Sequence, residues 1–462
     1  MNTKQLRQKI LDLAIRGKLV PQDPNDEPAS VFLEKIRIEK ERLIKEKKIK
    51  RSKNELTVST GAKSHYQNVP FEIPENWVWV KLEDIVFLKA GFFVKANDIS
   101  KEYDINLFPC YGGNGLRGYV QDYTHEGLYA LIGRQGALCG NINLAKGKFH
   151  ATEHAIVVTP YGEINTLWMF YFLKALNLNQ YSIGAAQPGL SVERINKILC
   201  PLPCLPEQQR IVSVIETAFS LVDQIEENKL SLEQFIKQTK SKVLDIAIRG
   251  KLVPQDSADE PASILLERVK SKQKTSKITA DKFPYPFEVP LSWIWVSGYD
   301  CFRPMKSKKP KGEIFGYIDI NSVDNKKHII TKPKYLKVSE APSRANREVS
   351  AGDTLFSMVR PYLENIAYVD NQNADSIAST GFYVCKPTQM LFPKYLYYLM
   401  LSSYVIEGLN TFMKGDNSPS INNDNITSFL YPLPPLTEQH RIVIQIEKIF
   451  AQLNKIEKAL KA

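Results

Sequence analysis

The sequence predicts an α+β protein in which two globular α/β bodies are separated by long paired helices, arranged as a two-fold repeat. The first observation is a duplicated segment. Residues 11–30 read LDLAIRGKLVPQDPNDEPAS, and residues 244–263 repeat them with seventeen identities in twenty. Two further pairs follow the same plan: FEIPENWVWV at 71–80 with FEVPLSWIWV at 287–296, and LCPLPCLPEQQRIVSVIE at 199–216 with LYPLPPLTEQHRIVIQIE at 430–447. Self-similarity of this kind determines the architecture before any local pattern is considered.

The second observation concerns the two ends of the chain. The segments 199–216 and 430–447 are offset by 231 residues, and this offset aligns Ala462 with Ser231. The segments 11–30 and 244–263 are offset by 233 residues, and this offset aligns Met1 with Gln234. The last and first residues therefore correspond to neighbouring parts of one internal segment. We interpret the chain as a circularly permuted repeat with pseudo-two-fold symmetry, in which the chain ends interrupt a single helical element.

Composition limits the class of protein. The chain has 462 residues, 43% of them hydrophobic, which is ample for globular cores. It has no apolar run of the roughly 20 residues that a transmembrane helix needs, and its first residues, MNTKQLRQKI, lack the apolar centre of a signal peptide. Six irregularly spaced cysteines fit a reducing cytoplasm. The net charge of +11 favours a polyanionic partner, although many soluble proteins share such a charge.

Residues 1–70 are expected to hold the N-terminal part of the split helical region and a basic linker. Residues 34–53 carry ten Lys or Arg against four Glu. The first half of this run is expected to be the end of a helix, and the rest to grade into a polar linker. Two interpretations stay open: a solvated charged face, or contact with phosphates. A weaker basic run recurs at 268–282.

Two bodies are expected at 71–205 and 286–436. Each opens on a Trp-rich, alternating segment typical of a strand, and short β-type segments with Gly turns follow. LWMFYFLKAL at 167–176 predicts a helix with mostly buried side chains, and KYLYYLMLSSYVIEGL at 394–409 takes its place in the second body. The segment 354–370 likewise takes the place of the segment around Arg134. The bodies share scaffold residues but differ in their loops, which is expected if one fold carries two recognition surfaces.

The clearest helix runs from about Pro206 to Leu252, within a central helical region expected at 206–285, and residues 437–462 are expected to complete the split region. Apolar residues recur in steps of four and three, which is typical of helices that pair by knobs-into-holes contacts. Packing on a globular core is the alternative. Gly17 and Gly250 are expected to stop the helices. The predicted seam comprises Ile211, Ile215, Val222, Ile225, Leu232, Ile236, Val243, Ile442, Ile446, Ile449, Leu453, Ile456 and Leu460.

Several motifs could carry chemistry, but none forms a catalytic constellation. Residues 113–118 read GNGLRG, a literal GxGxxG, yet no amphipathic helix is predicted after it, so a ligand-contacting loop is favoured over dinucleotide binding. His150 and His154 lie in a β-like segment, and Cys200 and Cys204 have no counterpart in the second copy. P-loop, HExxH and amino-methyltransferase motifs are absent from the sequence. We predict a non-enzymatic protein without metal or cofactor.

Together these segments resemble the specificity subunit of a type I restriction–modification enzyme, over nearly all of the chain. The resemblance rests on YGGNGLRGYV, LIGRQGALCGN, FHATEHAIVV, the paired LPCLPEQQRI and LPPLTEQHRI, and the doubled AIRGKLVPQD. It implies two target-recognition domains held apart by an antiparallel two-helix coiled coil. Each domain would read one half of a bipartite site in double-stranded DNA. Two methyltransferase subunits and the restriction subunits would assemble with it for adenine methylation or cleavage.

Within each domain, phosphate contacts should fix the register and a few polar side chains should read base edges. Arg134 and Arg360 fall at equivalent places in the aligned sequences, so a shared phosphate role is expected for them. Arg with guanine and Asn or Gln with adenine would be the usual direct pairings. The candidate residues are, in the first domain, Lys95, Asn97, Tyr111, Asn114, Arg117, Arg134, Gln135 and Gln187, and in the second, Lys306, Lys308, Lys309, Asn321, Ser322, Arg344, Arg347, Arg360, Tyr362, Lys414 and Asn417.

Three other functions stay open at this stage. The first is an enzyme that acts on DNA alone, which the missing motifs disfavour. The second is a coiled-coil adaptor that binds proteins but not DNA. The third is a specificity subunit that serves methylation only or another phage-defence complex. The target sequence and the length of its unread spacer do not follow from the residues.

Overall fold

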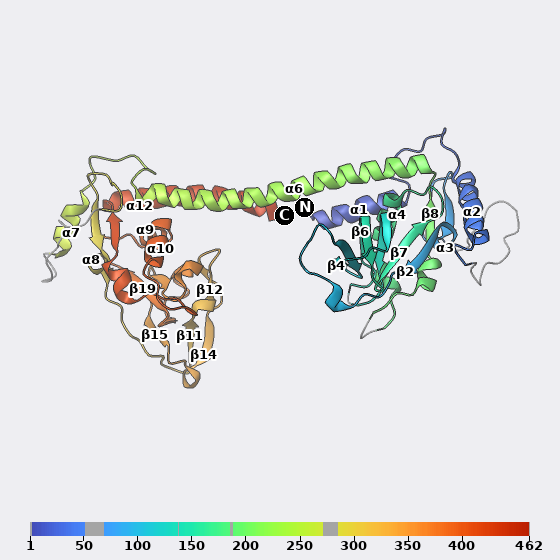
Figure 1. The fold of residues 1–462 in the computed structure, drawn as a ribbon. Helices are drawn as coiled ribbons and strands as arrows, with labels where there is room; N and C mark the ends of the chain where they lie inside the picture. The colour runs from blue at the N-terminus through green and yellow to red at the C-terminus, as the bar shows by residue number, and fades with distance from the viewer. Residues whose placement is uncertain (1, 51–68, 137, 185–187, 271–284, 462) are drawn as a thin grey trace. The chain divides into compact units, whose positions relative to one another are not determined.

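The computed structural model describes residues 2–50, 69–136, 138–184, 188–270 and 285–461. The chain divides into two compact units, Met1–Asn228 (unit 1) and Lys229–Ala462 (unit 2). The long helix α6 (Leu205–Ile248) continues from the first unit into the second (Figure 1). It ends four residues before the predicted limit, and Gly250 follows it with a left-handed φ of +70°. The predicted α+β class is confirmed.

In unit 1, helix α1 (Thr3–Ile15) runs antiparallel to the N-terminal half of α6. Arg7 of α1 is 2.5 Å from the carboxylate of Asp223, whereas Arg210, earlier in α6, binds Asp26, which follows α1. Helix α1 buries Ile10, Leu11 and Ala14 in the core of unit 1. Helix α2 (Ala29–Lys45) follows and buries Phe32, Leu33 and Ile36. The predicted linker at 51–68 lies outside the described residues.

The body of unit 1 is a six-stranded sheet in the order β2-β7-β5-β6-β3-β4. All neighbouring strands are antiparallel except β3 and β6. Helix α4 (Thr166–Ala175) buries Trp168, Met169, Phe172 and Leu173, as the apolar run predicts. The strand bounds are β2 Val86–Ala90, β3 Phe108–Gly112, β4 Gly115–Val120, β5 His125–Gly133, β6 Ile142–Ala151 and β7 Ala155–Pro160. A separate pair, β1 (Val78–Lys81) and β8 (Leu199–Leu202), joins the body to α6, with α3 (Leu82–Ile85) and α5 (Val192–Asn196) beside it.

Unit 2 distributes its strands over two four-stranded sheets and two strand pairs. The first sheet has the order β10-β19-β16-β17 and the second the order β14-β11-β18-β15, in which β11 and β18 are parallel. The strands are β9 Ile294–Ser297, β10 Phe302–Arg303, β11 Ile314–Ile318, β12 Val323–Asp324, β13 Ile329–Ile330, β14 Lys334–Lys337, β15 Ala345–Glu348, β16 Thr354–Ser357, β17 Ile366–Tyr368, β18 Ile377–Ser379, β19 Phe382–Pro387 and β20 Leu430–Leu433. The helices are α7 Ala262–Lys270, α8 Gly298–Cys301, α9 Pro393–Met400, α10 Ser403–Asn410, α11 Asn423–Ser428 and α12 Leu436–Lys461.

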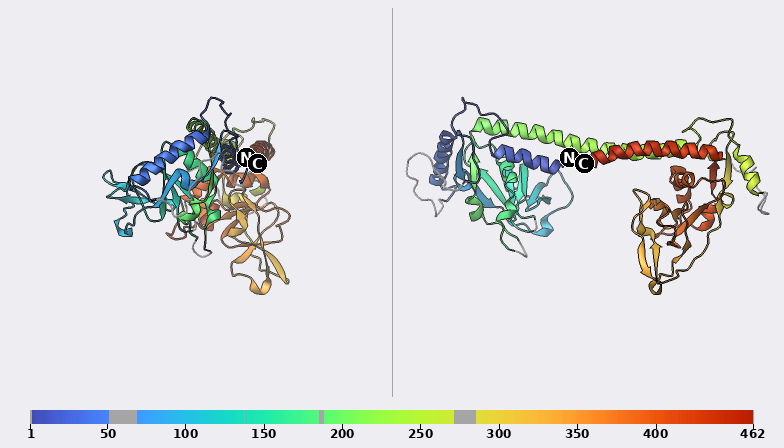
Figure 2. Two further views of the ribbon diagram at one scale, coloured as in Figure 1. Left: turned by 90° about the vertical axis from the view of Figure 1, so that its right-hand side faces the viewer. Right: turned by 180° about the vertical axis from the view of Figure 1, so that it is seen from behind.

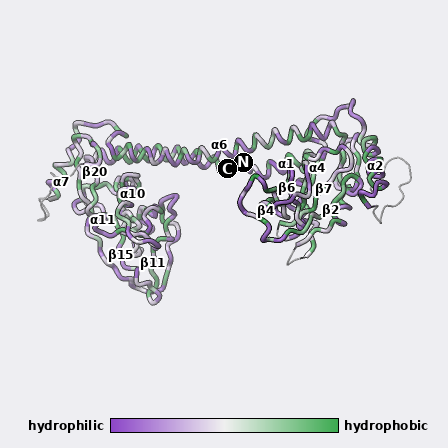
Figure 3. The backbone as a smooth tube through the Cα atoms, viewed as in Figure 1, coloured by the Kyte–Doolittle hydropathy of each residue, from purple (hydrophilic) through white to green (hydrophobic). Residues whose placement is uncertain are grey.

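The C-terminal half of α6 runs antiparallel to α12 within unit 2 (Figure 2, right). Lys240 contacts Asn454 and Glu457, whereas Arg441, at the start of α12, binds Asp259 beyond the end of α6. Along α6 the hydropathy changes between apolar and polar every few residues, as one buried face requires (Figure 3). These helix pairs confirm the predicted helical pairing.

The residues of the predicted seam are buried where the helices lie near the body of each unit, and more exposed further along. Ile211, Ile215 and Val222 are buried in α6, as are Ile236 and Val243 further along, and Ile442 and Ile446 in α12. Nearer the middle of α6, Ile225 is 42% and Leu232 40% exposed, and towards the end of α12 Ile456 is 44% exposed. Apolar periodicity therefore identifies the helices and their buried ends, but not how much each position is covered.

The helix predicted at 394–409 is instead two helices, α9 and α10. Ser402 lies between them, and its side chain accepts a hydrogen bond from the backbone N–H of Val405. A serine hydroxyl at such a position starts a new helix, since it satisfies a donor that has no partner inside the helix. The apolar pattern continues across the break, which explains why it predicts one helix.

Both units close the junction between body and helix with the same contacts. The indole Nε1 of Trp77 donates to Glu207 Oε2 at 2.8 Å, and that of Trp293 donates to Glu438 Oε2 at 2.8 Å. Glu207 and Glu438 are buried, and this burial raises the pKa of each carboxyl group. The duplicated sequence therefore encodes one junction that is built twice.

A tightly packed glycine completes each junction. Gly17 has a φ of +64°, and a Cβ atom at this position would lie 2.4 Å from Cγ of Pro74. At Gly250, with φ +70°, the corresponding distance to Pro290 is also 2.4 Å. Only glycine meets both requirements, the left-handed backbone and the close approach of a proline ring.

All six cysteines are buried and unpaired: Cys110, Cys139, Cys200, Cys204, Cys301 and Cys385. Burial raises the pKa of every one of these thiols, to about 11 for Cys204. No helix among the described residues is long and apolar enough to cross a membrane.

Candidate nucleic-acid interface

In unit 1, three loop segments meet beside the ends of β5 and β7. Arg134, directly after β5, donates its backbone N–H to His154 O at 2.8 Å, and its carbonyl accepts from Leu190 N at 2.9 Å. A Cβ atom on Gly133 would lie 2.1 Å from Gly113 O, so the turn after β3 packs directly against the end of β5. The three segments are residues 111–115, 133–141 and 183–190, of which Ala137 and 185–187 lie outside the described part of the chain.

Polar side chains occupy the tips of these loops. Asn114 is exposed, and its Oδ1 accepts a hydrogen bond from Asn141 Nδ2 at 3.0 Å. Gln135 is exposed and is held by a β-bridge to Gly189, and Arg134 is half-buried. Gln187, expected in the same group, lies outside the described residues. The backbone fixes these groups in place while their polar ends remain available, as base reading requires.

The GxGxxG segment is a β-hairpin. Gly113 and Asn114 form the turn between β3 and β4, and Gly115 has a φ of +96°. The described chain from there to β5 contains strands and a short loop and no helix, so no helix N-terminus is available for a pyrophosphate. This geometry agrees with the expected ligand-contacting loop.

Unit 2 builds the same arrangement from different residues. Ile421 N donates to Met358 O at 2.9 Å, as Leu190 N does to Arg134 O in unit 1. Lys414 and Ser420 are joined by a β-bridge, like Ile183 and Gly189. The corresponding segments are residues 318–322, 357–365 and 414–421.

These hydrogen bonds correct the alignment of Arg134 with Arg360. Met358 is the residue that corresponds to Arg134, because both accept the same bond from the facing loop. Two residues later, Gly136 N donates to Pro188 O and Arg360 N donates to Pro419 O, so Arg360 takes the place of Gly136. Both have positive φ, +94° and +47°. The predicted equivalence was wrong because sequence similarity does not reveal the left-handed turn that sets the register.

Arg360 is held in this unfavourable conformation by its surroundings. Its guanidinium Nη2 donates to Asn417 O at 2.9 Å, and Tyr362 beside it is exposed. Arginine with φ near +50° is uncommon, and such residues gather at functional sites, where surrounding contacts maintain the strain. The loop that carries Arg360 is therefore joined directly to the loop that carries Lys414 and Asn417.

Asn114 and Asn321 occupy equivalent positions. Tyr111, one residue before the end of β3, pairs in parallel with β6, and Ile318 at the end of β11 pairs in parallel with β18. Three residues beyond these pairs come Asn114 and Asn321, both exposed. The two bodies thus place an asparagine amide at the same point of the fold, although the letters around it differ.

Ser322, the next predicted residue, has a structural role. It is 1% exposed, and its hydroxyl donates to Asp319 Oδ1 at 3.0 Å, which caps the short 3₁₀ helix Ile320–Ser322. A hydroxyl that is buried and satisfied cannot reach a base edge. We therefore remove Ser322 from the set of candidate contacts.

A basic strip runs along the edge strand β15 in unit 2. Glu348 N donates to Lys306 O, Lys308 N donates to Asn346 O, and Ser307 is bridged to Arg347. Lys306, Lys308 and Lys309 are exposed, and none forms an ion pair with a carboxylate in the described part of the chain. Arg344, exposed just before β15, extends the strip. Such free cations suit phosphate contact.

The sequence interpretation missed two exposed aromatic residues in unit 1. Phe92 is 50% and Phe93 72% exposed, beside the predicted Lys95 and Asn97, which are also exposed. Phe92 N donates to Ala151 O, which fixes this segment against the end of β6. The available signal was an adjacent pair of phenylalanines in a polar, Gly-containing stretch. The remaining predicted residues of unit 1 are Tyr111, half-buried with its ring against Phe149 at 5.8 Å, and Arg117, exposed on β4.

One group of side chains has metal-ligating chemistry. Asp26, Cys204 and Glu207 lie close together, but Arg210 binds the Asp26 carboxylate, and Trp77 and Gln22 donate to Glu207. The hydrogen bond from Arg210 lowers the pKa of Asp26. In unit 2 the same carboxylates keep the same partners although Pro435 replaces the cysteine. These contacts indicate a structural network rather than an ion site.

A family model described as the type I restriction modification DNA specificity domain matches residues 74–234 and again residues 301–462. Among curated proteins, the type I restriction enzyme EcoprrI specificity subunit of Escherichia coli is 43% identical over 147 residues, which are 32% of this chain and 37% of that protein. The EcoEI specificity subunit of Escherichia coli is 26% identical over 558 aligned positions, covering 99% of this chain and 91% of the relative.

Among solved structures, an HsdS subunit from Thermoanaerobacter tengcongensis has 32% sequence identity over 38% of this chain and 46% of its own, with a TM-score of 0.36. A type I restriction-modification S subunit from M. genitalium covers 85% of this chain and 95% of its own at 16% identity, with a TM-score of 0.33.

Proposed function

Because the chain belongs to the type I restriction modification DNA specificity family, we propose that it is the DNA-reading subunit of a type I restriction–modification complex. In this role it binds a bipartite, asymmetric target in double-stranded DNA, and each body reads one half-site. The chain performs no catalysis itself. It positions the subunits that methylate adenine or cleave DNA.

One observation carries this proposal: two bodies with the same loop scaffold present different side chains at equivalent points. The left-handed position holds Gly136 in one body and Arg360 in the other. The preceding position holds Gln135 in one and Val359 in the other. A single fold with two different polar surfaces is what an asymmetric pair of half-sites requires.

We assign the recognition domains to residues 71–205 and 286–436, with the helical regions at 1–70, 206–285 and 437–462. The roles of the candidate residues divide by charge and position. Lys95, Arg117, Lys306, Lys308, Lys309, Arg344 and Arg347 would contact phosphates and set the register. The side-chain amides of Asn114 and Asn321 would accept and donate hydrogen bonds at base edges. Adenine is the usual partner of an asparagine amide. Asn97, Tyr111, Arg134, Gln135, Arg360, Tyr362, Lys414 and Asn417 complete the surface, with Arg360 suited to guanine.

The duplicated paired helices suggest where other subunits bind. Each unit carries the same paired helices beside the same buried Glu–Trp junction. Two equal surfaces fit two copies of one partner, which we propose to be the methyltransferase subunit, with the motor-nuclease subunits joining that assembly. We place this complex in the cytoplasm, where its DNA substrate would be.

A single-base map of adenine methylation tests the proposal directly. We expect methylation at a two-part motif with a fixed unread gap, in cells that contain this gene and the methyltransferase gene beside it. Deleting this gene should remove the methylation at that motif and leave other adenine methylation unchanged. If an active methyltransferase partner is present and no motif depends on the gene, the proposed function is wrong.

A further inference from the structure

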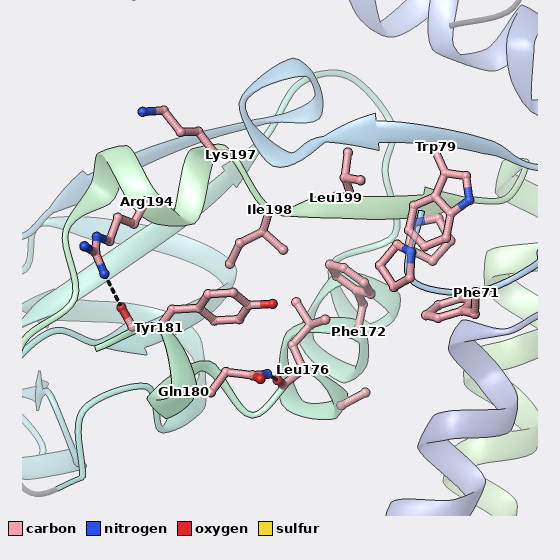
Figure 4. Close-up of a pocket in the computed structure, with 13 residues that line it drawn as sticks. Phe71, Trp79, Phe172, Leu176, Gln180, Tyr181, Arg194, Lys197, Ile198 and Leu199 are labelled. Carbon is pink, nitrogen blue, oxygen red and sulfur yellow. Dashed lines mark hydrogen bonds between the residues drawn. The ribbon is translucent and has the colours of Figure 1, made fainter. Parts of the chain in front are cut away.

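Unit 1 has an apolar pocket on the side of the body next to α1, lined from β1, α4, α5 and β8 and the segments beside them. Its volume is about 640 Å³. Phe71, Trp79, Phe172 and Ile198 line it, and Tyr181 extends across one side of it (Figure 4). None of these residues belongs to the loops that we assign to DNA. The pocket is therefore separate from the loops that would read the target.

At the corresponding place in unit 2, a tyrosine covers part of the hollow, and a smaller hollow of about 450 Å³ lined by Pro286, Tyr404 and Phe429 remains beside it. Phe71 and Trp79 meet edge to face with ring centres 5.0 Å apart, and their counterparts Phe287 and Trp295 meet at 4.8 Å. In unit 2, a further ring packs against this pair: Tyr404 lies 5.1 Å from Phe287 and 5.8 Å from Trp295. Its hydroxyl donates to Leu430 O at 2.8 Å.

The repeat alignment explains why the pocket is open in unit 1. Tyr171 packs on Phe219 as Tyr398 packs on Phe450, both at 5.8 Å, which fixes the helices α4 and α9 in the same register. Counting onward from this register, Asn177 stands where unit 2 has Tyr404. Asn177 has a φ of +48° and starts a short 3₁₀ turn, Leu178–Tyr181, in place of helix α10. Unit 1 thus lacks the ring that covers the Phe–Trp pair in unit 2.

The rim of the open pocket is positively charged. Arg194 and Lys197 line it from α5 and the residue that follows, and Arg194 is held toward it by a 3.5 Å hydrogen bond to Tyr181 O (Figure 4). The guanidinium of Arg16 lies over the ring of Phe71, 4.6 Å from its centre. Asp12 binds Arg16 and Glu193 binds Lys197, whereas Arg194 forms no ion pair within the described residues. Arg194 therefore gives this rim a net positive charge, which favours an acidic ligand.

We propose that this pocket receives an aromatic side chain, carried by an acidic segment of a partner protein. The counterpart in unit 2 shows which group this place accommodates: one tyrosine ring against the Phe–Trp pair, with its hydroxyl bonded to a strand carbonyl. A volume of about 640 Å³ exceeds that of one ring, so the neighbouring side chains of the segment enter with it. The charged rim selects segments with carboxylates beside the aromatic residue.

This surface is independent of the DNA loops and differs between the units. It would let a partner distinguish the two halves of an otherwise symmetric scaffold. In unit 2 the ring of Tyr404 already covers the Phe–Trp pair, so a partner's ring would reach such a pair in unit 1. The proposed contact therefore belongs to unit 1, whereas both units have the paired helices.

The test uses the full chain and a synthetic peptide, Ac-Glu-Asp-Tyr-Leu-Glu-Asp-NH₂, with a version that has Ala in place of Tyr as control. Binding is followed by tryptophan fluorescence, since Trp79 lines the pocket, and by calorimetry. We expect saturable binding of the tyrosine peptide that weakens as salt increases. The alanine peptide should bind at least about tenfold more weakly, because the ring fills the apolar part of the pocket.

Two variants locate the binding. Ala175→Trp places a large ring in the pocket and should abolish binding. The double variant Arg194→Gln and Lys197→Gln removes two exposed positive charges and leaves the backbone unchanged. It should weaken peptide binding roughly fivefold. Its matched control is Lys4→Gln and Lys9→Gln on the exposed face of α1, which should leave the affinity unchanged.

The outcomes separate this inference from the proposed function. Target DNA should bind the Ala175→Trp chain as it binds the original, so loss of peptide binding with intact DNA binding supports the inference. Equal binding of both peptides, or of the peptide to the Ala175→Trp chain, overturns it. Deoxyadenosine monophosphate is titrated in parallel, and if it binds the pocket in place of the peptide, the site takes a nucleobase and the inference is wrong.

Discussion

Substitution of Gly17 by alanine should open the junction of unit 1. The backbone at Gly17 has a φ of +64°, and a left-handed residue with a Cβ atom costs about 1–2 kcal/mol. The new methyl group would also lie 2.4 and 2.6 Å from ring atoms of Pro74 and 3.2 Å from Trp77. Overpacking of this kind adds about 1–3 kcal/mol, since the proline ring and the indole must both move. We expect a total of about 2–5 kcal/mol.

A second glycine separates the two contributions. Gly147, within strand β6 and opposite Gly127 of β5, also has a left-handed φ, +79°, but a Cβ atom there meets nothing within 4 Å. Gly147→Ala should therefore lose only the conformational part, about 1–2 kcal/mol. The difference between the two variants measures the contact with Pro74.

The assay must report on each unit separately, because a chain of two units need not unfold in a single step. Hydrogen exchange followed by mass spectrometry gives local opening free energies for peptides of each junction. Gly17→Ala should increase exchange around Trp77 and leave the junction at Trp293 unchanged, and Gly250→Ala should do the reverse. Equal effects of Gly17→Ala and Gly147→Ala would refute the argument from packing.

Three other predictions follow from the charged and polar side chains. Lys308→Ala should weaken DNA binding about equally for all sequences and reduce the slope of log affinity against log salt by about one, as measured by fluorescence anisotropy; a change of preference at one base would contradict its phosphate role. Asn114→Ala should cost about 1–3 kcal/mol and relax the preference at a single position of one half-site, as a randomised-target selection would show, whereas a uniform loss would argue for a scaffold role. The hydrogen bond from Arg210 lowers the pKa of Asp26, so its stabilisation is present above the unfolded value near 4 and is lost as pH falls through the lower, folded value. Asp26→Asn should therefore lower the unfolding temperature at pH 7 and flatten its dependence on pH below about 4, and calorimetry that showed parallel pH curves would disprove this.

The architecture was predictable because the segments that determine it occur twice in the sequence. The repeated AIRGKLVPQD segments fix the junctions, and the apolar steps of four and three fix α6 and α12, where burial of a stripe dominates the energy. A loop at Asn114 was also predictable from composition, since Gly and Asn favour turns, although it was not predicted to be a hairpin. In each case a local rule and the fold agree.

The details of the site were less predictable because they depend on contacts between distant loops. The register of Arg360 is set by its hydrogen bond to Pro419 O, 59 positions away along the chain, and no local pattern encodes it. The break at Ser402 was hidden because the apolar residues continue through it. Ser322 resembles a surface residue in sequence, yet its hydroxyl is buried and donates a hydrogen bond to Asp319. The open pocket could not be predicted either, since it depends on which ring the second unit has and the first lacks.

The six buried cysteines have a practical consequence. Thiol reagents attack the thiolate, and each of these side chains is both inaccessible and held protonated by its raised pKa. The unmodified protein should therefore remain unlabelled by maleimides while it is folded. A pair of cysteines introduced on the exposed face of α6, one on each side of Lys229, would then be the sole attachment points for spin labels or fluorophores. Distances between such labels would follow the straightness of this helix in solution, with and without DNA, on the natural background of the chain.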